Sequence, residues 1–219
     1  MQTRIKICGL RSPERAAEIA KMGADAIGLV FAESPRRVTP AQARMVTDAL
    51  PPAVAAVGVF VDTDAETINR IVAEASLTMA QLHGDEPPEI VTDLTVPVIK
   101  AFRVRDAGWI DEVSAWLDGV QSLEHVAAVL LDAYVPGVAG GTGERFNWDW
   151  VTEAREAGRL EAIPPLILSG GLDTENVAEA IRIVQPWMVD VSSGVESAPG
   201  VKDLSKVEAF IRAARQQKT

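Results

Sequence analysis

The chain has 219 residues, with 31 acidic and 21 basic side chains and a formal net charge of −10. A surface of this sign repels phosphate backbones, which argues against general nucleic-acid binding but leaves room for a small anionic substrate at a locally positive site. No leader-like start and no apolar stretch of membrane-spanning length is present, and a single cysteine fits a reducing compartment, so we expect a cytoplasmic protein without a membrane partner.

Short apolar runs alternate along the chain with stretches that have the spacing of amphipathic helices. The runs predicted as strands are 5–8, 26–31, 54–61, 79–82, 96–102, 126–131, 165–168 and 187–191. Capping signals predict helix starts at Ser12-Pro13, Thr39-Pro40, Asp64, Glu86-Pro87-Pro88, Asp106, Asp149, Asp173–Asn176 and Lys202-Asp203.

Eight strand–helix units without consecutive hairpins predict a parallel sheet with helical crossovers. We therefore predict an α/β fold in which residues 1–219 form one domain, a closed (β/α)8 barrel with outer helices. An open doubly wound sheet is the structural alternative. The absence of a G-x-G-x-x-G fingerprint after the first strand argues against that alternative.

Two glycine-containing loops follow the last two predicted strands. Gly170 and Gly171 come directly after the seventh strand, and Ser193 and Gly194 come after the eighth. Such loops either merely end the strands or let backbone N–H groups approach an anion, and barrels often bind phosphate between these two loops. The presence of both loops favours phosphate binding.

An acid closes the sixth predicted strand, because Asp132 follows Leu131 directly. A carboxylate there is either a structural cap or a catalytic group, and the C-terminal end of a barrel strand favours catalysis. The next segment holds Gly140, Gly141, Thr142 and Gly143, which either wrap a ligand or form a mobile loop.

Three further polar residues follow strands two and four. Arg36 and Arg37 form a pair suited to carboxylate or phosphate, although two loop arginines are commonly just solvated. His83 ends the fourth strand, where a hydrogen-bonded structural role is the default interpretation and substrate binding the alternative. The spacing of histidines and carboxylates around the lone cysteine, Cys8, predicts no metal site.

Seven motifs, in their order along the chain, resemble those of the phosphoribosylanthranilate isomerase family of tryptophan biosynthesis. They are Lys6–Leu10, Gly28–Phe31 with Ser34–Arg37, Gly58–Val61, Gln81–Asp85, Leu131-Asp132 with Gly140–Gly143, Leu168–Leu172 and Asp190–Glu196. A small departure is Phe146-Asn147-Trp148, where the family usually has Phe-Asp-Trp, beyond the active-site loop.

The resemblance implies a (β/α)8 barrel that performs an Amadori rearrangement as an aldose–ketose type intramolecular oxidoreductase, without cofactor or metal. Its small-molecule substrate would be N-(5-phosphoribosyl)anthranilate, and the protein would act as a monomer or homodimer. Asp132 would be the general acid, Cys8 the general base, and Arg36 the partner of the anthranilate carboxylate. The substrate phosphate would be bound by the backbone amides of five residues: Gly141, Gly170, Gly171, Ser193 and Gly194.

Strand alternation places Lys6 and Cys8 on one face of the first strand and Ile5 and Ile7 on the other. A free thiol is mostly protonated at neutral pH, and the charge of Lys6 would favour the thiolate. If this face points into the barrel, the ammonium needs an acidic partner there. Because the eighth strand closes against the first, we predict that Asp190 pairs with Lys6. Asp190 is also a candidate substrate-binding residue.

Two other functions compete with this interpretation. The related ProFAR isomerase of histidine synthesis performs the same rearrangement on another ribosyl amine. The barrel of that family has an aspartate at the position of Cys8, so the cysteine argues against this alternative. A non-catalytic phosphate-binding barrel is the second alternative, and the presence of both Cys8 and Asp132 argues against it.

Overall fold

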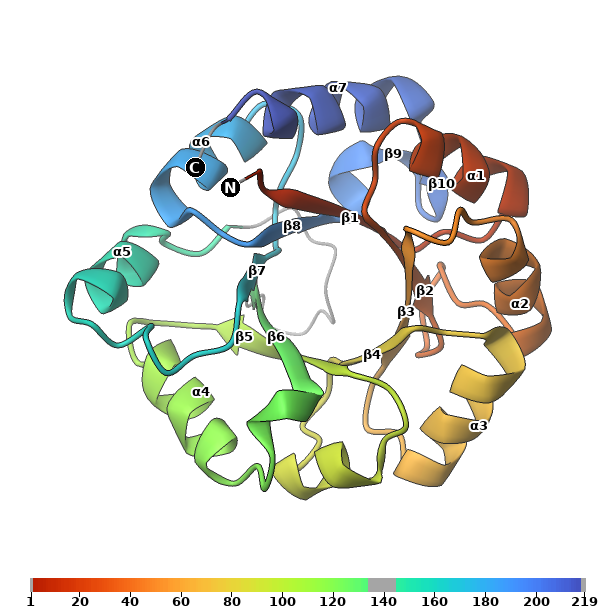
Figure 1. Cartoon of the computed structure of the whole chain (residues 1–219). Helices are drawn as coiled ribbons and strands as arrows, with labels where there is room; N and C mark the ends of the chain where they lie inside the picture. The colour runs from red at the N-terminus through yellow and green to blue at the C-terminus, as the bar shows by residue number, and fades with distance from the viewer. Residues whose placement is uncertain (1, 134–144, 218–219) are drawn as a thin grey trace.

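The computed structural model describes residues 2–133 and 145–217. In this part of the chain eight parallel strands close into a barrel in sequence order, and β8 pairs with β1 (Figure 1). The strands are β1 (Arg4–Cys8), β2 (Ala26–Val30), β3 (Ala55–Phe60), β4 (Met79–Leu82), β5 (Val98–Val104), β6 (Val126–Ala133), β7 (Leu166–Leu168) and β8 (Met188–Val191). The predicted fold is confirmed.

Helices surround the barrel and cover its outer face (Figure 1). The α-helices of the described residues are α1 (Pro13–Lys21), α2 (Pro40–Asp48), α3 (Ala65–Ala75), α4 (Trp109–Asp118), α5 (Asp149–Glu156), α6 (Val177–Val184) and α7 (Leu204–Arg215). Ser12, Thr39, Asp64 and Asp203 accept backbone N–H groups of the first turns of α1, α2, α3 and α7. These four predicted starts are confirmed, because each capping side chain satisfies N–H groups that lack a helical partner.

The segments on either side of β5 differ from the prediction. After β4 the chain forms a single 3-10 helix, η1 (Pro88–Asp93), in place of an amphipathic α-helix. Consecutive prolines at its start remove backbone donors and restrict the preceding residue. After β5, α4 begins at Trp109 instead of Asp106, whose carboxylate accepts the N–H of Gly108 in a turn ahead of the helix.

A short hairpin between β8 and α7 was not predicted. It consists of β9 (Glu196–Ala198) and β10 (Val201–Lys202), which pair antiparallel. Strands of two and three residues are too short to have a recognisable alternation. Two further 3-10 turns, η2 (Leu123–His125) and η3 (Ser193–Val195), complete the described elements.

The alternation along β1 separates two environments. Ile5 and Ile7 are fully buried in the core between the sheet and the helices. Lys6 and Cys8 point the other way, into the barrel, where Lys6 is fully buried and Cys8 lies at the C-terminal end. The thiol of Cys8 therefore lies inside the barrel, at the C-terminal end of the strands.

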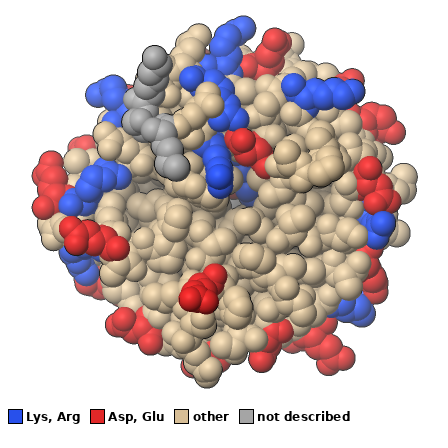
Figure 2. Space-filling view, in the orientation of Figure 1, with Lys and Arg blue, Asp and Glu red and all other residues tan. Residues whose placement is uncertain are grey.

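The two ends of the described chain are joined by Arg215 of α7. Its guanidinium donates to the carbonyl oxygens of Thr3 and Gly23 and pairs with Asp25 at 2.7 Å. On the face shown in Figure 2, most charged side chains lie around the rim, whose lower edge is mainly acidic, and much of the surface toward the centre is uncharged. None of the helices in the described ranges has the length and apolar character needed to cross a membrane.

Candidate active site

A hollow of about 870 Å³, open to solvent, lies at the C-terminal ends of the strands. Every strand, or the loop directly after it, supplies part of the wall. The polar lining residues are Cys8, Glu33, Ser34, Arg36, Gln81, His83, Arg103, Asp132, Ser169, Asp190, Ser192 and Ser193. This is the end of a (β/α)8 barrel at which catalytic groups are normally found.

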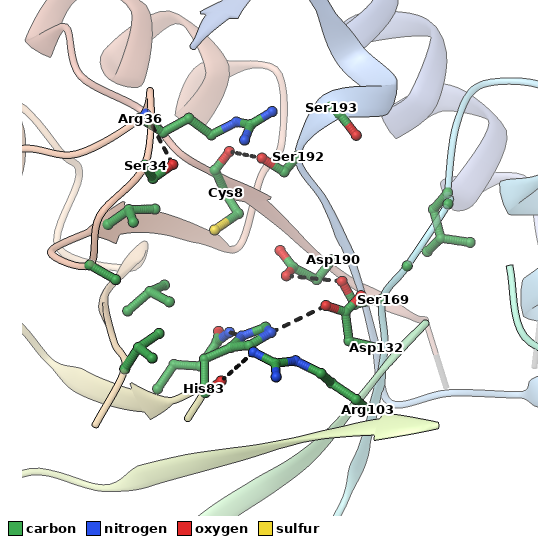
Figure 3. Close-up of a pocket in the computed structure, with 18 of the residues that line it drawn as sticks. Cys8, Ser34, Arg36, His83, Arg103, Asp132, Ser169, Asp190, Ser192 and Ser193 are labelled. Carbon is green, nitrogen blue, oxygen red and sulfur yellow. Dashed lines mark hydrogen bonds and ion pairs between the residues drawn. The ribbon is translucent and has the colours of Figure 1, made fainter. Parts of the chain in front are cut away.

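Cys8 and Asp132 point into this hollow from opposite walls (Figure 3). Both are largely buried, with exposed fractions of 8% and 7%. Gly28 on β2 leaves room for the thiol, because a Cβ at that position would lie 2.6 Å from Cys8 Sγ. The barrel therefore brings together a thiol and a carboxyl that are 124 residues apart in the sequence.

Lys6 and Asp190 form a buried ion pair directly below Cys8. Lys6 Nζ lies 3.0 Å from Asp190 Oδ1, and the two side chains are 0% and 6% exposed. Ser169 adds a longer hydrogen bond of 3.4 Å to Asp190 Oδ2 (Figure 3). The predicted pairing is confirmed, since barrel closure places Lys6 and Asp190 in register on β1 and β8.

Opposing effects act on the ionisation of Cys8. Burial raises the pKa of the Cys8 thiol, and the positive charges of Lys6 and Lys202 only partly oppose that effect. For Lys6, burial also disfavours the charge, but the Asp190 carboxylate and Cys8 together raise the pKa of the ammonium. The site thus holds a charged lysine beside a thiol that resists ionisation.

Arg36 is held by a carboxylate that the sequence analysis did not assign. Its Nε and Nη2 atoms each donate to Glu196 at 2.8 Å, and these hydrogen bonds raise the pKa of the guanidinium. Lys202 lies 2.7 Å from the same carboxylate, so two cations share one anion. Despite burial, the two cations lower the pKa of Glu196. Arg37, by contrast, is exposed and does not line the hollow.

The two glycine-containing loops meet at the edge of the hollow. Gly170 and Gly171 have φ angles of 82° and 62°, which favour glycine, and both line the hollow with Ser193. Gly194 does not line it. A Cβ on Gly194 would overlap the carbonyl oxygen of Leu172, so this glycine lets the two loops pack together. The fifth predicted phosphate-binding residue, Gly141, lies outside the described residues.

His83 lies beside Asp132 at the end of β4, and its Nε2 is 3.2 Å from Asp132 Oδ2. Arg103 lines the same wall from β5, in register with Asp132, and its Nη2 lies 3.5 Å from the His83 carbonyl oxygen. Arg103 was missed because the fifth strand was predicted to end at Phe102, one residue earlier. Glu196 was missed because nothing local indicates its contact with Arg36.

Comparison with known proteins gives concordant results. A family model described as N-(5'phosphoribosyl)anthranilate (PRA) isomerase matches residues 5–213. The N-(5'-phosphoribosyl)anthranilate isomerase of Geobacter metallireducens is 47% identical over 213 residues, covering 97% of this chain and 98% of its own.

Solved structures agree with these matches. Phosphoribosyl anthranilate isomerase of Thermotoga maritima has a TM-score of 0.87 at 36% identity, covering 99% of this chain and 100% of its own. Mutually generated monomers of the dimeric Thermotoga maritima enzyme give 0.84 at 34% identity, with the same coverage. A phosphoribosyl anthranilate isomerase in complex with reduced 1-(o-carboxyphenylamino)-1-deoxyribulose 5-phosphate gives 0.83 at 36% identity, again covering 99% and 100%.

Proposed function

Because the chain belongs to the N-(5'-phosphoribosyl)anthranilate isomerase family and is an isomerase of tryptophan biosynthesis, we propose that Asp132 and Cys8 perform its acid–base chemistry. The observation that carries this proposal is the placement of a carboxyl and a thiol on opposite walls of one hollow (Figure 3). A substrate bound between them can exchange protons with both. The match to this family over residues 5–213 argues against both alternatives, which are the isomerase of histidine synthesis and the non-catalytic phosphate-binding barrel.

In the proposed reaction Asp132 protonates the ribose ring oxygen, and the bond from that oxygen to C1 breaks to give an open-chain iminium ion. Cys8, as thiolate, then removes the proton from C2, which gives an enolamine. Return of a proton to C1 and loss of the proton from the C2 hydroxyl give the ketone. Protons and electrons balance, and no external oxidant or reductant takes part.

In this order of steps, the positively charged iminium ion forms before Cys8 has to act as a thiolate. Burial raises the pKa of the thiol, so ionisation needs added positive charge. The iminium ion supplies that charge beside Cys8 and also acidifies the C2–H bond. Lys6, held in its charged form by Asp190, supplies a second and permanent positive charge.

Arg36 is proposed to bind the anthranilate carboxylate. A guanidinium has five N–H donors, and Glu196 occupies two of them in this structure. The cluster of Arg36, Lys202 and Glu196 carries a formal charge of +1, one cation more than its anion needs. It therefore retains both donors and charge for one carboxylate.

The phosphate is proposed to bind at the loops after β7 and β8. Asn176 stabilises the first loop, because its side chain donates to the carbonyl oxygen of Gly171 at 2.8 Å. The left-handed conformations of Gly170 and Gly171 support close approach of backbone N–H groups to an anion. Gly194 contributes indirectly, by allowing the second loop to pack against the first.

We further propose that the enzyme acts in the cytoplasm as a monomer or homodimer, on a small-molecule substrate without nucleic-acid or membrane partners. Cys8 is a free thiol, and a catalytic thiol needs a compartment that keeps it reduced. The dimeric Thermotoga maritima relative supports the homodimer as one of the two assemblies.

The test is turnover of phosphoribosylanthranilate by purified Cys8→Ala and Asp132→Asn, followed as loss of substrate fluorescence. We expect each variant to lose about 10²- to 10⁴-fold in kcat, which is the usual contribution of a general acid or base. Asp118→Asn, on the exposed end of α4, is the matched carboxylate control and should turn over like the wild type. Near-wild-type turnover by both active-site variants would refute the proposal.

A further inference from the structure

The imidazole of His83 lies between two polar side chains. Gln81 Nε2 is 2.8 Å from His83 Nδ1. Asp132 Oδ2 is 3.2 Å from His83 Nε2 (Figure 3). Gln81 and Asp132 are only 1% and 7% exposed. Both ring nitrogens are therefore engaged by buried groups, and neither is left to bind the substrate.

The other oxygen of Asp132 is fixed separately. Asp132 Oδ1 accepts the backbone N–H of Ala133 at 3.0 Å. Gly170 packs against the same oxygen, since a Cβ at that position would lie 2.9 Å from it. Because Oδ1 faces the backbone, Oδ2 is the oxygen available to carry the acid proton, and His83 is the side chain that contacts it.

The two protonation states of Asp132 require different donors on His83. An ionised carboxylate accepts Nε2–H, which leaves Nδ1 to accept a hydrogen bond from the Gln81 amide nitrogen. Before substrate binds, a protonated carboxyl instead donates to Nε2, which places the ring hydrogen on Nδ1, where it needs an acceptor. Gln81 has such an acceptor in Oε1, which is buried and without a hydrogen-bond partner among the described residues. When substrate is bound, the carboxyl proton turns from Nε2 to the ribose ring oxygen.

A half-turn of the Gln81 amide exchanges its donor for its acceptor at Nδ1. The chain of Gln81, His83 and Asp132 can thus keep both of its hydrogen bonds in two states, with Asp132 protonated before substrate binds and with Asp132 ionised after it has given up its proton. Buried polar groups without partners are costly and uncommon, and this exchange explains why Oε1 is unpaired in one of the two states.

We propose that His83 is a positioning residue for the acid Asp132, oriented by Gln81, and does not bind the substrate. The inference rests on the proposed function, in which Asp132 protonates the ribose ring oxygen. Loss of His83 would leave Asp132 Oδ2 without the side chain that orients it toward that oxygen, while the rest of the hollow stays intact. The effect should therefore fall on the chemical step and not on binding.

The experiment measures kcat and KM for phosphoribosylanthranilate and the Kd for the product analogue reduced 1-(o-carboxyphenylamino)-1-deoxyribulose 5-phosphate. For His83→Ala we expect kcat to fall about 10- to 100-fold, the scale of a misplaced catalytic group, with KM and Kd changed less than about threefold. Gln81→Met, which removes both hydrogen-bonding atoms, should lower kcat in the same direction. His125→Ala, on exposed η2, is the matched control and should leave all three constants unchanged.

A double variant separates positioning from an independent role. Adding His83→Ala to Asp132→Asn should cause no further loss of kcat, because the acid on which His83 acts is already absent. An equal further loss would overturn the inference, as would a raised KM and weakened analogue binding with kcat preserved.

Wild-type kcat in Gln81→Met would overturn the role of Gln81. Wild-type turnover by Asp132→Asn alone would instead refute the proposed function.

Discussion

Lys6 carries a full charge inside a barrel whose interior is otherwise largely apolar. Its ammonium is tolerated because Asp190 neutralises it at 3.0 Å, and because both groups are held in register on neighbouring strands. The same ammonium is one of the two positive charges that oppose the effect of burial on Cys8. A single buried pair therefore links the stability of the barrel to the chemistry at its open end.

This link predicts a pH effect. The base works only as thiolate, so the rate rises with pH through the pKa of Cys8, which burial raises. The double variant Lys6→Met/Asp190→Asn removes the pair without leaving an unpaired charge in the barrel. Because the charge of Lys6 lowers the pKa of Cys8 by more than Asp190 raises it, we expect the rising limb of kcat/KM against pH to move to higher pH.

The control for that measurement is Arg215→Met/Asp25→Asn, which makes the same charge change in an ion pair that lies beside Ile5 and Thr3, at the other end of β1. Its profile should keep the wild-type midpoint. A midpoint that stays in place or moves to lower pH in Lys6→Met/Asp190→Asn would show that Lys6 does not favour the thiolate.

At the scale of elements, the carboxylate of Glu86 holds the connection between β4 and β5 in place. Glu86 is 4% exposed and accepts the N–H groups of Asp62 and Gly84, and its carbonyl oxygen accepts the indole N–H of Trp116. Lys100 on β5 neutralises it at 2.8 Å and also donates to the carbonyl oxygen of Gly84. These contacts take the place of a packed α-helix in fixing the segment that follows His83.

Removing one partner of this pair should destabilise the protein more than removing both. Glu86→Gln leaves the Lys100 ammonium buried and unpaired, and we expect a loss of about 3–5 kcal/mol in the free energy of unfolding. Glu86→Gln/Lys100→Met leaves no buried charge and should lose clearly less. Urea denaturation measures both values. Equal losses for the single and double variants would mean that the hydrogen bonds of Glu86, and not its pairing, stabilise the loop.

At the scale of the whole molecule, the order of the strands was predictable because each is buried on both faces and is therefore an apolar run in the sequence. Strand ends were not predictable in the same way, and the fifth strand lies about two residues later than predicted, at Val98–Val104. Where a capping side chain marks a helix start, as at Ser12 and Asp64, the prediction was confirmed. At Asp106 the carboxylate instead stabilises a turn ahead of the helix.

The site was predictable where alternation and barrel closure alone decide geometry, as for Lys6 and Asp190. Contacts that depend on how a loop folds back were not predictable. Arg36 meets Glu196 across 160 positions through a hairpin too short to be recognised. The contacts of His83 likewise depend on side-chain directions at the ends of β4 and β6, which spacing does not specify.

Removal of the ribose C2 proton by Cys8 is the step on which the whole mechanism depends. The most direct test is turnover of phosphoribosylanthranilate carrying deuterium at ribose C2 by the Cys8→Ser variant, compared with the undeuterated substrate. A hydroxyl in place of the thiol is a much weaker base at neutral pH, so we predict slow turnover with a primary isotope effect, because proton removal then limits the rate. Turnover at the wild-type rate without an isotope effect would show that another group takes that proton.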